Sequence, residues 1–533
     1  MLNIILDNLF NNKKTAIFIL VFFYFFGSIS SLTTGISHDS FHEQLNWIIN
    51  FNFIKTVFSG NLNFTELKNY QDKYYGIGFQ FLSQPLQYFI APIVEYFFNI
   101  SKYGAHLLSK NLITFNFFFI SGYFIYLIFL EIIKDKKYSF IFTLTYYFYP
   151  YFLGHSFINP KDSPFATMWI INTYFFLKII INLYLDKKIS YNYLFTSSLL
   201  TAFLFSIRIS GLLILIQYAI SLIIFFNIKN KFFLVIFIKN NIYKFLFFII
   251  NCLIFTVILY PIFWSNPFEV YYAIISMSKH YNNVCTYLMG ECVKANELPI
   301  NYIPLWLLFK LPITIIIGLF IFLFVEKKIF KHKINIIFLG TISLSVLIIS
   351  LILIFLNVHL YNEIRQVSFL ITLLFIISLV SLYYYSKRIA LVLNLVTIFF
   401  FLVENVKMHP YQYTWFNSLS RTIDIQKNFE VDYWGVSNKN LSYELKKIIT
   451  NNNYSNICIF DGGYIKEFIN NENINCYNGY SKIDAEKIKP FLVVQNARNL
   501  YKNPKDCKIL FEEKYKLIFY QKDLLTGRLW LCD

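Results

Sequence analysis

Long apolar segments, each bounded by polar or charged residues, dominate this sequence and limit what it can fold into. A helix of about 20 apolar residues crosses the hydrocarbon core of a bilayer. Only 14% of the residues are charged, whereas a soluble domain has about a quarter. The sequence therefore predicts a polytopic α-helical membrane protein. Its eleven candidate spans are residues 15–33, 109–131, 138–154, 164–184, 193–208, 210–227, 244–263, 304–325, 334–356, 366–385 and 389–406.

The cations of the connecting segments predict how these spans are oriented. Alternate loops hold lysine clusters, such as those at 134–137 and 327–333, and the short loops between them hold only Lys161, Arg208 or Arg365. By the positive-inside rule the lysine-rich loops are cytoplasmic, as is the N-terminus. The net charge of +17 mostly reflects these flanking cations, so no nucleic-acid partner is predicted. We expect a multi-pass protein of the cytoplasmic (inner) membrane whose C-terminal part is extracytoplasmic.

Three long segments are expected on the outer side. Residues 34–108 contain an aromatic stretch at 84–100 that is typical of a helix lying in the membrane interface, and residues 264–303 form the second outer segment. In the tail, residues 407–533, helical and strand-like patterns alternate, which predicts a small α/β domain. We therefore divide the chain into a transmembrane domain, residues 1–406, and this tail domain.

Within the tail, the pattern predicts one helix and several strands. Six of the seven cysteines also fall on the predicted outer side, where an oxidising compartment permits disulfides. The predicted helix is 441–450, and the predicted strands are 456–460, 491–495 and 517–520. The candidate disulfides are Cys285–Cys292, which is local, and Cys458–Cys476 and Cys507–Cys532.

The charged stretch after the first apolar segment is the first candidate site. His38, Asp39, His42 and Glu43 lie within six positions of one another, at a membrane boundary where ionisable residues often serve a function. We interpret Asp39 as a catalytic carboxylate; the alternative is an interfacial loop with solvated charges. His38 and His42, four residues apart beside carboxylates, are also a plausible ligand set for a divalent metal.

Further polar side chains are expected at the same boundary. An isolated Lys-Asp pair is often a surface ion pair, and a lone arginine often anchors to phospholipid headgroups. Forked arginine donors also suit phosphate, however. Acids beside cations at a lipid surface suit group transfer from a lipid phosphate, since an acid deprotonates the nucleophile and cations stabilise the departing phosphate. The predicted donor-binding residues are Lys161, Arg208, Arg365, His155 and Asn159, and Asp162 is a further candidate catalytic acid.

Short motifs spread over most of the chain carry a family resemblance. They are Gly35–Asp39, His155–Phe165, Arg208–Gly211, Tyr260–Pro267, Leu298–Pro312, Tyr361–Phe369, His409–Tyr413 and Asp432–Gly435. In order, spacing and sidedness they resemble the GT-C membrane glycosyltransferases, in the protein-mannosyltransferase and aminoarabinose-transferase-like branch. The resemblance implies an inverting glycosyltransferase of the cell envelope. It would use a polyprenyl-phosphate-linked sugar and an acceptor glycan, lipid or protein.

The resemblance also implies a role for Asp39, which matches the family's acid in the first outer loop. Relatives commonly carry a second acid directly after it, and this chain has Ser40 there. Either Glu43 or Asp162 is then expected to act with Asp39. Some GT-C enzymes use a metal and others do not, so a divalent metal stays an open expectation.

Other functions are compatible with parts of the pattern. A transporter or flippase of lipid-linked saccharides would show charged or broken helices at mid-membrane, whereas these charges gather at one face. A ligase or polymerase using a diphosphate-linked donor would use arginines and a histidine of a late outer loop. A binding module on a membrane anchor would not need eleven spans.

Overall fold

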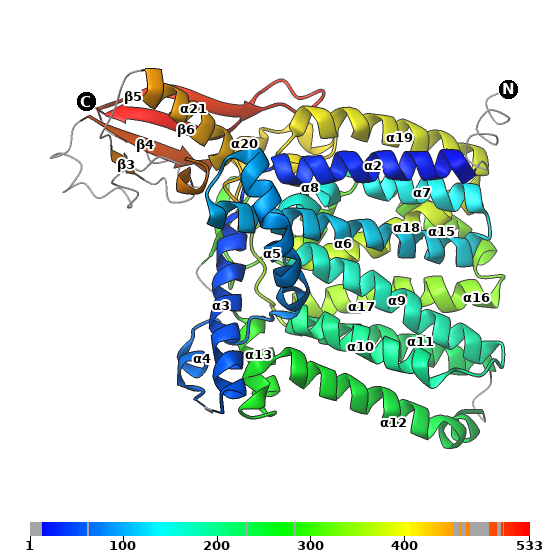
Figure 1. The fold of residues 1–533 in the computed structure, drawn as a ribbon. Helices are drawn as coiled ribbons and strands as arrows, with labels where there is room; N and C mark the ends of the chain where they lie inside the picture. Colours follow the sequence, from blue (N-terminus) through cyan, green and yellow to red (C-terminus); the bar gives the residue numbers. More distant parts are fainter. Residues whose placement is uncertain are drawn as a thin grey trace.

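Near-parallel helices form a bundle that makes up most of the molecule, and a small sheet lies beyond one end of it (Figure 1). The computed structural model describes residues 13–60, 63–229, 233–280, 284–451, 458–460, 465–469, 490–497, 503–504 and 506–532. The bundle helices are α2 (Lys13–Thr33), α6 (Lys102–Ile133), α7 (Lys136–Phe148), α8 (Pro150–Ile158), α9 (Asp162–Tyr184), α10 (Tyr191–Ile207), α11 (Ile214–Lys229), α12 (Phe233–Leu259), α14 (Tyr302–Lys310), α15 (Ile313–Ile329), α16 (Lys333–Asn335), α17 (Thr341–Phe355), α18 (Ser368–Tyr385) and α19 (Lys387–Met408).

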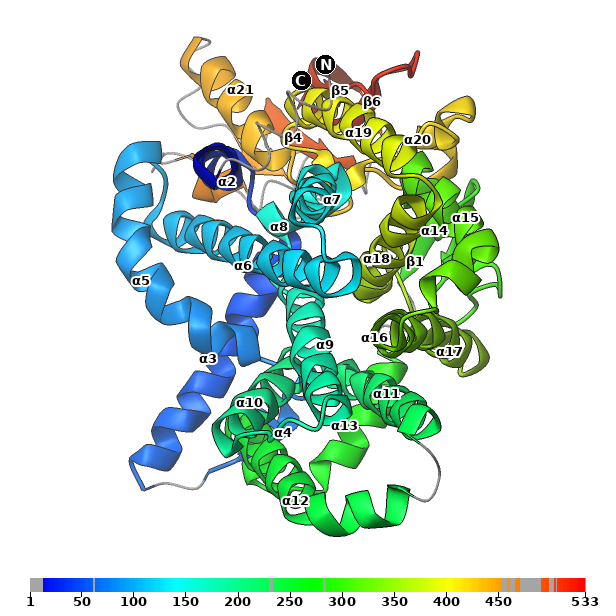
Figure 2. The same ribbon diagram turned by 90° about the vertical axis from the view of Figure 1, so that its right-hand side faces the viewer.

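The bundle confirms the prediction of a polytopic helical membrane protein. Within the described ranges, eight helices are long and apolar enough to cross a membrane, and the bent pair of α14 and α15 makes nine at most. The shorter helices α7 and α10 run alongside them (Figure 1). Helices α9 and α18 are central (Figure 2), with 83% and 89% of their apolar windows buried. All eleven predicted spans fall on helical segments.

Other helices cross the end of the bundle that lies nearest the sheet (Figure 1). They are α3 (His38–Phe58), α4 (Thr65–Asn69), α5 (Gly78–Phe98) and α13 (Glu269–Ser278). The segment predicted to lie in the interface falls largely within α5, which exposes Tyr88, Phe89, Tyr96 and Phe97. Short turns join the elements: η1 (Ile209–Leu213), η2 (Pro261–Trp264), the π-helical η3 (Ile336–Gly340), η4 (Arg365–Val367), η5 (Gln412–Thr414), η6 (Ser420–Thr422) and η7 (Ile465–Glu467).

The tail forms the small α/β unit that the sequence predicts. Strand β3 pairs in parallel with β4, and β4–β6 and β6–β5 are antiparallel, with Val493 opposite Trp530. Helix α21 covers this sheet, because Leu441 and Leu445 pack with Leu492 of β4. Its elements are α20 (Ile425–Asn428), α21 (Asn438–Asn451), β3 (Cys458–Phe460), β4 (Phe491–Asn496), β5 (Cys507–Tyr515) and β6 (Leu524–Cys532).

One predicted strand of the tail is wrong. Residues 517–520 form the turn between β5 and β6, where the Tyr520 amide donates to the Leu517 carbonyl at 3.3 Å. Leu517 and Tyr520 are buried because they join the core of the bundle, together with residues of the segment 411–436. The boundary between the two domains at residue 407 stays a prediction.

Two of the predicted disulfides are confirmed. Cys285–Cys292 closes a hairpin of β1 (Cys285–Leu288) and β2 (Glu291–Lys294), and Cys507–Cys532 joins β5 to β6. Cys476 lies outside the described residues, and so does the predicted Cys458–Cys476 pairing.

The contact between α15 and α18 gives a test of this packing. A Cβ on Gly318 would lie 2.6 Å from the carbonyl oxygen of Ser378, whereas a Cβ on Gly340 meets side-chain methyl groups, those of Ile224 at 3.3 Å and Ile336 at 3.8 Å. We expect Gly318→Ala to lower the free energy of unfolding by about 1–3 kcal/mol through overpacking. Gly340→Ala, the matched control, should not lower it. The melting temperatures of the two variants in detergent test this difference, and equal melting temperatures would contradict the described packing.

Candidate functional site

The first candidate stretch lies where α2 gives way to α3. Ser37 caps α3, since its hydroxyl accepts from the Ser40 amide at 3.3 Å, and this places Asp39 in the first turn. The same hydroxyl donates to the carbonyl of Ile158 at 2.8 Å. The His38 amide donates to the carbonyl of Trp434 at 3.2 Å. Three distant parts of the chain therefore meet at the start of this helix.

Arg365 joins the two predicted catalytic loops. One of its nitrogens, Nη1, donates to Oδ2 of Asp39 at 2.9 Å and to Oδ2 of Asp162 at 2.8 Å. The guanidinium carbon lies 5.2 Å from the ring centre of Tyr361 and 5.0 Å from that of Trp434. Charge-assisted hydrogen bonds and flanking rings together hold a buried guanidinium in one place.

Asp162 is held on several sides. Its Oδ1 pairs with Arg208, and its Oδ2 accepts from the Asn159 amide group at 3.0 Å. The side-chain oxygen of Asn159 accepts from the backbone amides of Lys161 and Asp162 at 3.1 and 2.8 Å, as in turns that asparagine stabilises. Nδ1 of His155 lies 3.1 Å from the Asn159 amide nitrogen. The stretch therefore forms a rigid turn that fixes its carboxylate.

Lys161 lies beside the second acid of α3. Its ammonium group is 3.2 Å from Oε1 of Glu43, donates to the carbonyl of Gly76 and lies 4.0 Å from the ring centre of Tyr75. Gln80 donates to the other oxygen of Glu43. Burial lowers the pKa of Lys161 to about 8, and the neighbouring charge of Glu43 only partly opposes this effect.

The three predicted catalytic acids differ in exposure. The side chain of Asp39 is 25% exposed, whereas those of Glu43 and Asp162 are each 1% exposed. Only Asp39 among these three is open to an incoming molecule. The other two hold cations in place.

An apolar cavity of about 200 Å³ adjoins this cluster. Lys161 and Arg208 line it, and so do apolar side chains such as Leu212, Met277 and Leu353. The cavity therefore combines cations with walls that suit a hydrocarbon chain. It is distinct from a hollow of about 790 Å³ on the tail, which none of these residues lines.

The two histidines of the first stretch have separate surroundings. His42 lies 3.6 Å from Asp72, which His280 contacts at 3.0 Å, whereas His38 lies beside Gly435. The described ranges contain no group of three or more His, Cys, Asp or Glu that could hold a metal ion. A divalent metal at His38 and His42 stays a prediction.

Several residues of the site have no clear signal in the sequence. Gly76 and Asp72 lie between α4 and α5, in a segment without a recognisable motif, and they meet Lys161 and His280 only through the fold. Glu363 is buried two residues before Arg365, where its carboxylate lies 2.7 Å from Lys310. A glutamate so close in sequence to an arginine would ordinarily predict a solvent-exposed ion pair.

The predicted site residues come from the start of α3, the segment from α8 to the start of α9, the end of α10 and η4, and the fold is that of a multi-pass membrane protein with a small α/β domain at one end of the bundle (Figure 1). No family model and no curated protein matches the chain. Among solved structures it is similar to the crystal structure of ArnT from Cupriavidus metallidurans bound to undecaprenyl phosphate. The identity is 9%, the TM-score is 0.46, and 97% of each chain is covered. A similarity this distant carries no argument about function.

Burial of the acids predicts different consequences for two matched substitutions. Asp162→Asn leaves Arg208 and Arg365 without their buried counter-charge, so we expect a loss of about 3–5 kcal/mol in the free energy of unfolding. Asp39→Asn removes the more exposed partner of the same Arg365 and should change stability much less. Melting temperatures in detergent test the difference. A smaller effect at Asp162 than at Asp39 would contradict the described burial.

Proposed function

We propose that the protein is an inverting glycosyltransferase that moves a sugar from a polyprenyl-phosphate donor to an acceptor outside the cytoplasmic membrane. The observation that carries this proposal is that an apolar cavity adjoins a cluster of charged side chains. An apolar cavity ends at Lys161 and Arg208, and the half-buried Asp39 is joined to the same cluster through Arg365 and Asp162.

The cavity and its cations support a lipid-phosphate donor. Apolar walls stabilise the isoprenoid chain near the phosphate, and the charges of Lys161 and Arg208 bind the phosphate itself. Arg365 does not line the cavity, and its Nη1 is engaged by two carboxylates. We therefore assign donor binding to Lys161 and Arg208, and to Arg365 the alignment of Asp39.

Asp39 acts as the base in the proposed reaction. It takes the proton from an acceptor hydroxyl as the oxygen attacks the anomeric carbon from the face opposite the phosphate. The bond between that carbon and the phosphate oxygen breaks, its electron pair stays on the phosphate, and the configuration inverts. Lys161 and Arg208 stabilise the phosphate charge that develops. Asp162 is the second acid of the site and acts through Arg365, and Glu43 holds Lys161.

The placement of the site supports the proposed location. The site lies at the end of the bundle near the sheet, whereas the described start of α2 and the lysine-rich loops around 134–137 and 327–333 lie at the opposite end (Figure 1). The positive-inside rule then puts the site on the outer side. Acceptors there include a glycan, a lipid or a protein.

Asp39→Asn tests the assignment of the base. We expect transfer to fall about 100- to 10,000-fold, the usual contribution of a positioned general base, with donor binding retained. The assay uses membranes with wild type or variant and a panel of labelled polyprenyl-phosphate sugars. Wild-type-like turnover in the variant would remove Asp39 as the base. A wild type that uses no member of the panel would contradict the proposed donor class, and diphosphate donors and transport would be tested next.

The pKa of Lys161 predicts a pH dependence of donor capture. Below about pH 8 the ammonium group is charged and binds the phosphate, and above it the charge is lost. Because kcat/KM reports the free enzyme, kcat/KM for the donor should fall as the pH rises through about 8. In Lys161→Arg the cation stays charged, so its remaining activity should show no such fall. Identical profiles for the two proteins would exclude Lys161 as the titrating group.

A further inference from the structure

Asn362 and Glu363, which lie shortly before Arg365 in the chain, have an unusual backbone conformation. Asn362 and Glu363 have φ angles of +50° and +68°, in the left-handed region. For residues other than glycine this conformation costs on the order of 1–2 kcal/mol each, so it persists only where neighbouring groups hold it. This left-handed turn leads directly into η4, which begins at Arg365.

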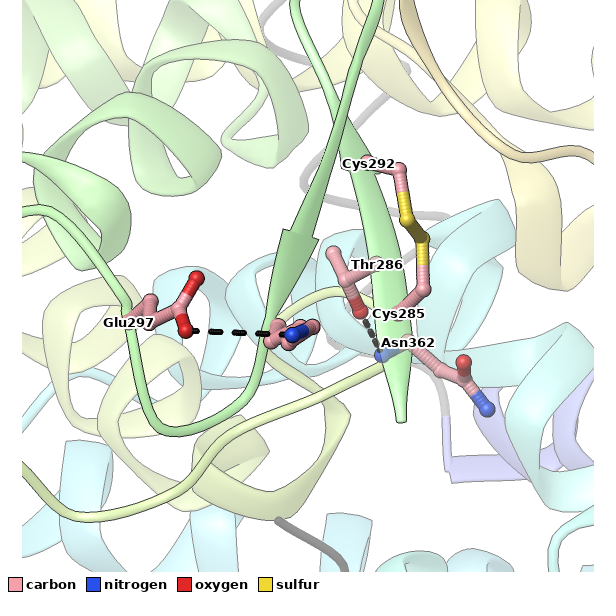
Figure 3. The surroundings of a disulfide bond; sticks show 6 residues. Cys285, Thr286, Cys292, Glu297 and Asn362 are labelled. Atoms are coloured by element: carbon pink, nitrogen blue, oxygen red, sulfur yellow. Dashed lines mark hydrogen bonds and ion pairs between the residues drawn. A yellow bond between two sulfur atoms is a disulfide. The ribbon is translucent and has the colours of Figure 1, made fainter. Parts of the chain in front are cut away.

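Buried contacts hold the left-handed turn in place. The hydroxyl oxygen of Thr286 accepts from the Asn362 amide at 2.6 Å (Figure 3). The carbonyl of Glu363 accepts from the Tyr302 hydroxyl at 2.9 Å, and the Glu363 carboxylate pairs with Lys310. Thr286 is 1% exposed, so water does not replace its hydroxyl at the Asn362 amide.

The strand that carries Thr286 is itself fixed by a cross-link. Thr286 and Leu288 face inward, as alternation along a strand requires, and the disulfide Cys285–Cys292 ties β1 to β2 (Figure 3). A two-stranded hairpin alone is marginally stable. A bridge between Leu288 and Phe429 docks this hairpin on the tail.

We propose that Thr286 is a positioning residue for the transfer reaction: its hydroxyl holds the left-handed turn that sets Arg365, and the Cys285–Cys292 disulfide holds Thr286. The inference rests on the proposed function, because Arg365 in turn aligns Asp39. Loss of the hydroxyl leaves the Asn362 amide without its acceptor. The turn then relaxes, and Arg365 no longer holds both carboxylates.

The central test compares Thr286→Val, which keeps the shape and removes the hydroxyl, with Thr286→Ser, which keeps the hydroxyl. We expect Thr286→Val to lower kcat about 10- to 100-fold, as misplacement of a catalytic group by up to about 1 Å does. The donor KM should stay near the wild-type value, because Lys161 and Arg208 bind the donor. Thr286→Ser should restore kcat. Equal kcat in wild type and Thr286→Val, or equal losses in both variants, would overturn the proposal.

The two disulfides of the described chain provide a matched comparison. Replacing Cys285 and Cys292 by alanine should lower kcat in the same way as Thr286→Val. Replacing Cys507 and Cys532, which join β5 and β6 far from Arg365 in sequence, should leave kcat unchanged. The reverse order, or equal losses for both pairs, would overturn the role of the hairpin disulfide. This comparison also decides the question if Thr286→Val does not fold.

A stability measurement separates failure of this inference from failure of the proposed function. In a double-mutant cycle of Thr286→Val and Arg365→Lys, the shifts in melting temperature should be non-additive, because Thr286 holds the turn that places Arg365. Additive shifts would overturn the coupling whatever reaction the protein catalyses. Non-additive shifts without sugar transfer would keep the coupling and remove the glycosyltransferase assignment.

Discussion

The arrangement of the site depends on the contacts of the Arg365 guanidinium. One nitrogen binds carboxylates from two segments, and these lie 326 and 203 residues away in the sequence. Removing a buried counter-charge is far more damaging than exchanging a whole ion pair for apolar groups. One side chain therefore aligns the carboxylates of Asp39 and Asp162 relative to each other, and any change that moves this side chain acts on both.

Charge balance explains how this cluster is tolerated next to apolar walls. Asp39 and Asp162 pair with Arg208 and Arg365, and Glu43 pairs separately with Lys161, so three acids face three cations. Buried charges are stable only when paired and hydrogen-bonded. Because these charges are balanced before any ligand enters, the phosphate of the proposed donor must compete with Glu43 and Asp162 for Lys161 and Arg208. Such competition favours a charged ligand that brings apolar surface with it.

Most of the fold follows from the sequence, because a chain in lipid must satisfy its backbone hydrogen bonds within each apolar segment. All eleven segments are therefore helical whatever their neighbours are. The prediction of a strand at residues 517–520 is wrong because a short apolar run has no periodicity that distinguishes a strand from a turn. The run is buried because it packs in the core of the bundle. For the site, the predicted orientation of the helices placed Asp39, Lys161 and Arg365 on the same side of the membrane. It did not show that Arg365 contacts acids, nor that Gly76, Thr286 and Glu363 hold their neighbours, because these pairings arise only when loops far apart in sequence fold together.

The tail contributes a residue to the site. Trp434 lies over the guanidinium of Arg365 and accepts the His38 amide through its carbonyl, although it follows the last bundle helix in the chain. During biosynthesis, the ribosome therefore delivers this wall of the site only after every membrane helix has been made. A nascent chain that has inserted its bundle helices but has not yet reached Trp434 therefore lacks this part of the site.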